Sequence, residues 1–263
     1  MKKGMIIILL GIFLLAGCDA FDKTSQNEFE AATKLWNAGD YQNAVKLYFE
    51  LVKDHPSSQR ADDALYWAGV TQFLYLGETE KSLQTFRLLL KRYPHRDMAP
   101  AAQWYIAQIY ELGYSDYERA IIEYRKAAEY SNPEVKEKSL YSLADNLFRL
   151  GKRDEARDVW MRQVTEFPNG SQSRLANYRL GTAAFAKGDL KSAESFYRKT
   201  LENGTDKELA IKAKFALAGC FEANDNLAEA LKLYKEIEPV YANPEAIQIK
   251  IRALETRIIK KSY

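Results

Sequence analysis

Six pairs of residues, each a small residue followed four positions later by an aromatic one, recur along this chain at a nearly constant interval. Successive small residues are 38, 38, 36, 37 and 37 positions apart. A fixed period of this size is the sequence signature of stacked structural repeats. The pairs are Ala44/Tyr48, Ser82/Phe86, Ala120/Tyr124, Ala156/Trp160, Ala193/Tyr197 and Ala230/Tyr234.

A turn signal precedes every pair. Gly, Asp and Asn tolerate the left-handed backbone conformation that ends a helix, so each repeat is predicted to be a helix, a short turn and a second helix. The chain is therefore expected to be all-α. The turns are Gly39-Asp40, Gly77-Glu78, Ser115-Asp116, Gly151-Lys152, Gly188-Asp189 and Asp225-Asn226.

This pattern resembles the tetratricopeptide repeat family, in which an A-x3-F element follows a W-x2-L-G-x2-Y stretch. Leu180-Gly181 matches the L-G element, and Trp67-Ala68-Gly69 matches it in part. The resemblance covers residues 25–243 and implies a solenoid of about six helical hairpins of 36–38 residues. It departs from the family in its period, which is longer than the usual 34, and the third repeat has an extra residue before its turn. Repeats close on Pro56, Pro94 and Pro168, and the fifth has Thr205 at that place.

A last helix is predicted over residues 244–263. Ile247, Ile251, Leu254 and Ile258 are spaced four, three and four, which makes one apolar stripe. A stack of repeats needs a terminal element that covers the last unit on one side and meets water on the other, so a capping helix is expected. The alternatives are a partner-binding helix or a membrane-surface helix.

The first seventeen residues have the features of a secretory signal. Lys2 and Lys3 give a positive start, and Met5 to Leu15 are an apolar run of eleven residues, too short to span a bilayer. The run ends in Leu15-Ala16-Gly17-Cys18, which resembles the bacterial lipoprotein box. By that resemblance residues 1–17 are removed, Cys18 becomes acylated, and residues 18–24 are a lipidated tether. An ordinary signal peptide with an incidental Cys is the alternative.

The resemblance places the mature protein on a membrane and facing the periplasm. Family resemblance favours the outer membrane, whereas Asp19 after the lipidated Cys favours the inner membrane in enteric bacteria. The only other cysteine, Cys220, is expected to be a small buried core residue, with a reactive thiol as the alternative.

The aromatic-Pro-polar repeat endings resemble a subgroup of periplasmic repeat proteins. This subgroup includes the BamD-type lipoproteins of outer-membrane protein assembly and the CpoB-type proteins of the Tol–Pal envelope system. Lipidated repeat proteins of the pilotin group, which assist secretin rings of pili, are a third relative. The resemblance implies a protein–protein interaction scaffold in the cell envelope, BamD-like or, alternatively, CpoB-like or pilotin-like.

Composition argues against two other classes of function. Removal of residues 1–17 leaves 36 basic and 36 acidic residues, so there is no basic excess of the kind that nonspecific nucleic-acid binding needs. No catalytic motif, phosphate loop or metal-ligand spacing occurs, and His55 and His95 both lie beside a Pro at predicted helix ends, where exposure is expected. The chain is predicted not to be an enzyme and to need no cofactor or metal. An anchored enzyme subunit is the less favoured alternative.

One feature of the predicted first helices suggests a binding surface. An aromatic residue lies fifteen or sixteen positions before each repeating small residue. In the tetratricopeptide family that face lines the inner groove, where peptide segments bind, so the six rings are candidate partner-binding residues. The alternative is that the rings pack between neighbouring first helices and stabilise the stack. Glu111, Asp145 and Arg149 are expected near the same face. The six are Phe29, Trp67, Trp104, Tyr141, Tyr178 and Phe215.

Overall fold

The structure is a computed structural model of the 263-residue chain, and it describes residues 23–202 and 204–261. The predicted signal peptide over residues 1–17 and the predicted lipid-bearing Cys18 lie outside the described residues. Residues 23 and 24, the last two of the predicted tether, are already helical. The described residues contain no β-strand, which confirms the all-α prediction.

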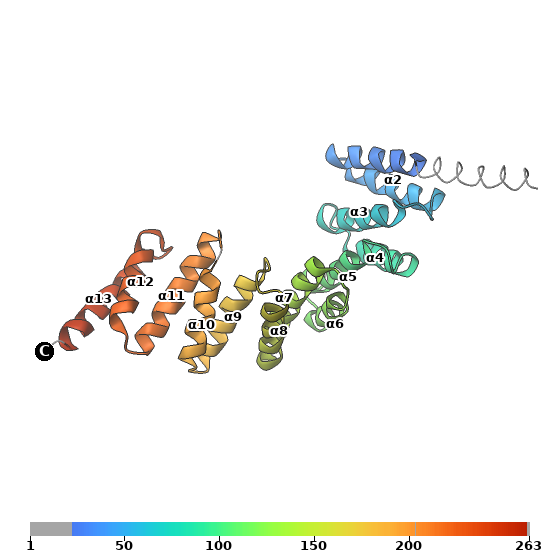
Figure 1. The fold of residues 1–263 in the computed structure, drawn as a ribbon. Coiled ribbons are helices and arrows are strands. Elements are labelled where there is room, and N and C mark those ends of the chain that lie inside the picture. The colour runs from blue at the N-terminus through green and yellow to red at the C-terminus, as the bar shows by residue number, and fades with distance from the viewer. Residues whose placement is uncertain (1–22, 203, 262–263) are drawn as a thin grey trace, which may run out of the picture. The chain divides into compact units, whose positions relative to one another are not determined.

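The chain divides at Lys136 into two compact units, each described here by itself. In unit 1 consecutive helices pack against one another, α2 on α3, α3 on α4, and α4 on α5 (Figure 1). Its elements are the helical residues 23–37, α2 (Tyr41–Asp54), α3 (Ala61–Leu74), α4 (Thr79–Arg92), α5 (Ala99–Gln108), the π-helix η1 (Ile109–Gly113), α6 (Tyr117–Ala128) and the start of α7 (Pro133–Arg149).

Unit 2 has the same plan, and its helices again pack in chain order from α8 to α13 (Figure 1). After the rest of α7 come α8 (Arg153–Glu166), α9 (Ser173–Ala186), α10 (Leu190–Leu201), α11 (Lys207–Ala223), α12 (Leu227–Ile237), the short 3-10 helix η2 (Glu238–Val240) and α13 (Pro244–Lys261).

The repeating pairs form the core, as predicted. Both members of every pair lie on the second helix of a hairpin, and none of the twelve side chains is more than 2% exposed. Burial of these aromatic side chains removes apolar surface from water. This is the main contribution to the stability of an amphipathic helix.

The six turns have the predicted conformation. Their first residues all have a positive φ, between 54° at Ser115 and 81° at Gly39. Three of the turns then supply a helix cap, because the side chains of Asp40, Asp116 and Asp189 accept a hydrogen bond from the backbone N–H three residues later. Each hairpin is thus closed by the residues that the sequence marked as a turn.

The extra residue of the third repeat has a distinct structure. Residues Ile109–Gly113 form a π-helix, in which the N–H of Tyr114 donates to the carbonyl of Ile109 at 3.1 Å. A π-turn inserts one residue into an α-helix without ending it. The insertion therefore lengthens this hairpin while the Ala120/Tyr124 pair keeps its buried position.

The C-terminal helix α13 caps the last hairpin, as predicted. Ile247, Ile251 and Leu254 are buried against α12 and α11. Ion pairs also join α13 to α11, because the Glu222 carboxylate of α11 lies 3.0 Å from Lys250 Nζ and 3.2 Å from Arg257 Nη1.

Candidate partner-binding surface

Three of the six predicted rings pack on the core aromatic of their own repeat. Their distances between ring centroids are 5.5 Å for Phe29–Tyr48, 5.8 Å for Tyr178–Tyr197 and 5.3 Å for Phe215–Tyr234. Each first-helix ring of the three is half-buried. One side of each ring thus packs on the second helix of its own hairpin, whereas the alternative considered from the sequence was packing between neighbouring first helices.

In the second repeat the ring in this position is Tyr66, and Trp67 lies one residue further on. Gly69 lies against the Phe86 ring as Gly181 lies against the Tyr197 ring, so the two glycines are equivalent. Tyr66 lies three residues before Gly69, as Tyr178 lies three residues before Gly181. The ring centroids of Tyr66 and Phe86 are 6.3 Å apart. Burial raises the pKa of the Tyr66 phenol, as expected for a packing position.

Trp67 instead contacts the first helix of the preceding repeat. Its ring lies 5.7 Å from that of Trp36, and the Trp36 indole N–H donates to Thr71 Oγ1 at 3.0 Å. Trp36 also contacts Tyr75 at 5.2 Å, and Tyr75 contacts Tyr41 at 4.6 Å. Trp67 and Tyr75 are 36% and 45% exposed. We call Trp36, Tyr41, Trp67 and Tyr75 the exposed aromatic cluster.

The remaining two rings are half-buried as well. Trp104 lies 5.1 Å from Tyr105, whose ring stacks on the core residue Phe86 at 5.2 Å. In unit 2, burial raises the pKa of the Tyr141 phenol, and the nearby charge of Arg179 opposes that shift. The structure thus places all six predicted residues on first helices, and the most exposed of them is Trp67.

The three polar residues expected near this face are already engaged. Glu111 accepts a hydrogen bond from the Tyr124 hydroxyl at 2.7 Å. Asp145 pairs with Arg149 at 3.1 Å and with Arg179 at 2.9 Å, so it joins α7 to α9. These groups hold their own helices in place and would have to exchange partners to bind a ligand.

Among the residues that the structure describes, two carboxylates are buried, and both have a structural function. Asp62 accepts a hydrogen bond from the N–H of Met98 at the start of α5, and Glu137 accepts one from the N–H of Gln172 at the start of α9. Each therefore caps a first helix of the next repeat, where a negative charge is favoured. Burial raises the pKa of Asp62.

The histidines differ from each other. His95 is exposed, as predicted. The prediction for His55 was wrong, because its side chain is only 14% exposed and its Nε2 lies 3.3 Å from Glu28 Oε1. The covering residue comes from the preceding helix, which adjacency to Pro56 could not reveal.

The free thiol of Cys220 lies in the core, as predicted, at 2% exposure. Within the described residues no group of three or more His, Cys, Asp or Glu side chains is placed to hold a metal ion. None of the helices in the described ranges is long and apolar enough to cross a membrane.

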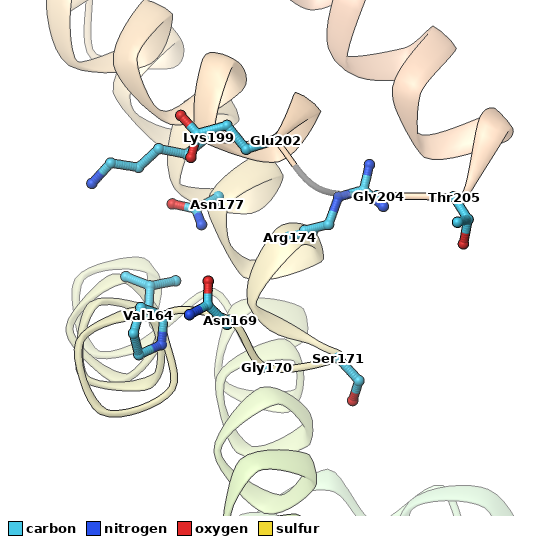
Figure 2. Close-up of a pocket in the computed structure, with 11 residues that line it drawn as sticks. Val164, Asn169, Gly170, Ser171, Arg174, Asn177, Lys199, Glu202, Gly204 and Thr205 are labelled. Atoms are coloured by element: carbon cyan, nitrogen blue, oxygen red, sulfur yellow. The ribbon is translucent and has the colours of Figure 1, made fainter.

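A cavity of about 370 Å³ lies in unit 2 between the loop after α8 and the end of α10. Figure 2 shows Asn169 and Ser171 in that loop, Arg174 and Asn177 on α9, and Lys199 on α10. Arg174 Nε donates to the carbonyl of Thr200 at 2.8 Å, whereas Arg174 Nη2 and Asn177 Oδ1 have no hydrogen-bond partner among the described residues. The cavity is polar and has none of the rings that define the exposed aromatic cluster.

Comparison with known proteins gives two kinds of similarity. Family models described as tetratricopeptide repeat match residues 63–95 and residues 141–208. No curated protein sequence matches the chain significantly.

Solved structures share the fold over most of the chain. The structure described as the functional characterisation of PilF from Pseudomonas aeruginosa is 12% identical, with a TM-score of 0.63, and covers 89% of this chain and 99% of its own. PilW, described as a widely conserved type IV pilus biogenesis factor, is 15% identical, with a TM-score of 0.55, and covers 88% and 99%. A tetratricopeptide repeat protein from Parabacteroides merdae is 14% identical, with a TM-score of 0.54 and coverage of 89% and 99%.

The structure agrees with these similarities. Both units consist of helical hairpins, and they contain the six buried pairs of a small and an aromatic residue and the six left-handed turns. The chain contains tetratricopeptide repeats over residues 63–95 and 141–208, and it shares the helical-hairpin fold of a solved tetratricopeptide repeat protein over most of its length.

Proposed function

We propose that this protein is a lipid-anchored scaffold on the periplasmic side of the cell envelope that binds a segment of a partner protein along the first helices of its repeats. The exposed aromatic cluster carries the proposal. Large rings lose little rotamer freedom on binding, and clustered Trp and Tyr side chains dominate the energetics of many interfaces.

The cluster is suited to binding because it is held in place before a partner arrives. The Trp36 ring is fixed by its hydrogen bond to Thr71 and by contacts with three other rings. The exposed edges of Trp67 and Tyr75 therefore need little ordering, which lowers the entropic cost of association.

We further propose that the pathway served is pilus or secretin assembly. The predicted Cys18 anchor and the resemblance to lipidated repeat proteins of the pilotin group support this reading, as does a fold shared along almost the full length of PilW. A BamD-like role in outer-membrane protein assembly is the competing outcome of the experiment below.

The test is photo-crosslinking in intact cells with a photoreactive amino acid in place of Trp67. A matched probe replaces Lys91, an exposed residue on α4, which is a second helix. Capture of a secretin or pilus component at position 67 but not at position 91 would support the proposal. Capture of barrel-assembly components would support the BamD-like role instead, and Tol–Pal components the CpoB-like one. Equal weak background at both positions would overturn binding at the exposed aromatic cluster.

A further inference from the structure

A long furrow runs along the second helices of the first two repeats. The helices α2 and α4 flank it, and α3 lies beneath, where it contributes the buried Gln72. Two cavities of about 570 and 330 Å³ make up the furrow, and they adjoin each other because Phe49 and Leu88 line both. No first-helix residue of the exposed aromatic cluster takes part.

The floor of the furrow is largely apolar, and its polar groups are satisfied. Val52 and Tyr93 are 2% and 8% exposed, and the rings and methyl groups of Phe49 and Leu88 are half-buried. The Tyr93 hydroxyl donates to the carbonyl of Pro56 at 2.6 Å. The Thr85 hydroxyl donates to Gln72 Oε1 at 2.7 Å. An apolar side chain of a partner can therefore enter the furrow without leaving a buried polar atom without a hydrogen-bond partner.

The rim is positively charged. Lys53, Lys81 and Arg92 line the furrow, and no carboxylate does. Lys81 pairs with Glu78 at 2.7 Å, whereas Lys53 and Arg92 have no acidic partner among the described residues. The chain after residue 17 has equal numbers of acidic and basic residues. All the charged residues that line the furrow are basic, so charge is unevenly distributed at this place.

The opposite flank of α2 has the reverse charge. A smaller cavity of about 190 Å³ separates α2 from the helical residues 23–37. Its lining contains three carboxylates and no cation: Glu28, Glu50 and Asp54, with Ala31, Leu47 and Leu51. The charged residues that line the two sides of α2 thus differ in sign, although Lys46 pairs with Glu50 at 3.8 Å without lining either cavity.

We propose that the furrow between α2 and α4 binds an acidic amphipathic segment of a protein partner. Its apolar residues cover Phe49 and Leu88, and its carboxylates pair with Lys53 and Arg92. A carboxylate that approaches these cations forms charge-assisted hydrogen bonds, which are stronger than neutral ones. A protein segment fits better than an anionic membrane surface, because the apolar lining is recessed between two helices and a bilayer presents no ridge to fill it.

This surface is separate from the exposed aromatic cluster, so each can fail without the other. The probe is a fluorescent synthetic peptide of about four helical turns, with Leu at alternating spacings of three and four and Glu beside the Leu stripe. A second peptide has Lys in place of every Glu. Binding is followed by fluorescence anisotropy, with the full chain held in nanodiscs of phosphatidylcholine, a zwitterionic lipid with no net charge.

The decisive comparison uses two variants of equal charge. Lys53→Gln/Arg92→Gln removes two furrow cations, and Lys46→Gln/Lys91→Gln removes two exposed cations of the same helices that do not line the furrow. We expect the first to weaken binding of the acidic peptide about tenfold or more and the second about twofold or less. Phe49→Ala should also weaken it, and the Lys peptide should not bind. Circular dichroism checks that each variant is folded.

Four outcomes would overturn the proposal. The two double variants could weaken binding equally, which would show a nonspecific electrostatic effect. The acidic and basic peptides could bind alike, or neither could bind. Finally, phosphatidylglycerol vesicles could bind the chain in a manner that depends on Lys53 and Arg92 while the acidic peptide does not, which would assign these cations to a lipid surface.

Discussion

Gly181 lies directly against the aromatic ring of Tyr197. A Cβ built on Gly181 would come within 2.7 Å of the ring carbons Cδ1 and Cε1 of Tyr197. This distance is shorter than any normal carbon–carbon contact, so only glycine lets α9 approach α10 this closely. Gly69 and the Phe86 ring repeat the relationship in unit 1, where the distance would be 2.8 Å.

The first prediction concerns this close approach. Gly181→Ala should lower the free energy of unfolding by about 1–3 kcal/mol, because the added methyl group overpacks the hairpin and moves the Tyr197 ring. Urea denaturation followed by far-ultraviolet circular dichroism measures the change. The matched control is Gly219→Ala on α11, where a Cβ would meet no atom within 4 Å. That variant should gain about 0.5–1 kcal/mol from helix propensity. Equal stabilities of the two variants would contradict the argument.

The second prediction concerns the cap of α10. A hydrogen bond from the Ser192 side chain, joined by one from the Ser192 backbone N–H, lowers the pKa of Asp189. A carboxyl group whose pKa is lower in the folded state stabilises the fold at a pH above its unfolded pKa of about 3.9. That contribution is lost as the pH falls through the folded-state pKa.

The comparison for Asp189 is with Asp189→Asn, which keeps the acceptor but does not titrate. The native chain should be the more stable of the two near neutral pH, where its carboxylate faces the positive end of the helix dipole. The difference should shrink when the pH falls below about 4. Thermal denaturation of both proteins across this range provides the measurement. A difference that stays constant with pH would rule out the charge of Asp189 as its source.

Spacing alone predicted the hairpins and their turns because the physical requirements are local. A left-handed residue ends each first helix, and a small residue lets each second helix pack closely, so both appear at every period. The rings on the first helices were harder to place. The second repeat is 38 residues long, and four residues join α3 to α4 where three join α9 to α10. Counting back from Ser82 therefore selects Trp67, although Tyr66 occupies the equivalent position.

Contacts between repeats were outside the reach of sequence reasoning. Asp62 of the second repeat caps α5 of the third, although Asp62 and Met98 lie 36 positions apart. The furrow between α2 and α4 combines residues of two repeats with no shared motif. Such features depend on how neighbouring hairpins stack, and the helix period does not specify that.

The third prediction concerns the reactivity of Cys220. Burial, with a smaller contribution from the charge of Glu194, raises the pKa of this thiol to about 11. Only the thiolate reacts, so Cys220 should be almost inert toward a disulfide reagent at neutral pH while the protein is folded. Cys18→Ser leaves Cys220 as the single cysteine, and its labelling is followed by absorbance. The reaction should become fast and complete in guanidinium chloride. Rapid labelling of the folded protein would contradict burial of the thiol.

The last prediction tests the anchor on which the proposed localisation rests. Cys18 follows Leu15-Ala16-Gly17 at the end of the apolar leader, and acylation there would give stable attachment to a membrane. Cys18→Ser should move the protein from the membrane fraction to the soluble fraction and leave its helical circular dichroism unchanged. Cys220→Ser makes the same chemical change in the core and should leave the protein on the membrane. If Cys18→Ser protein stayed on the membrane after a salt wash, either the lipid anchor would be ruled out or a second anchor would exist.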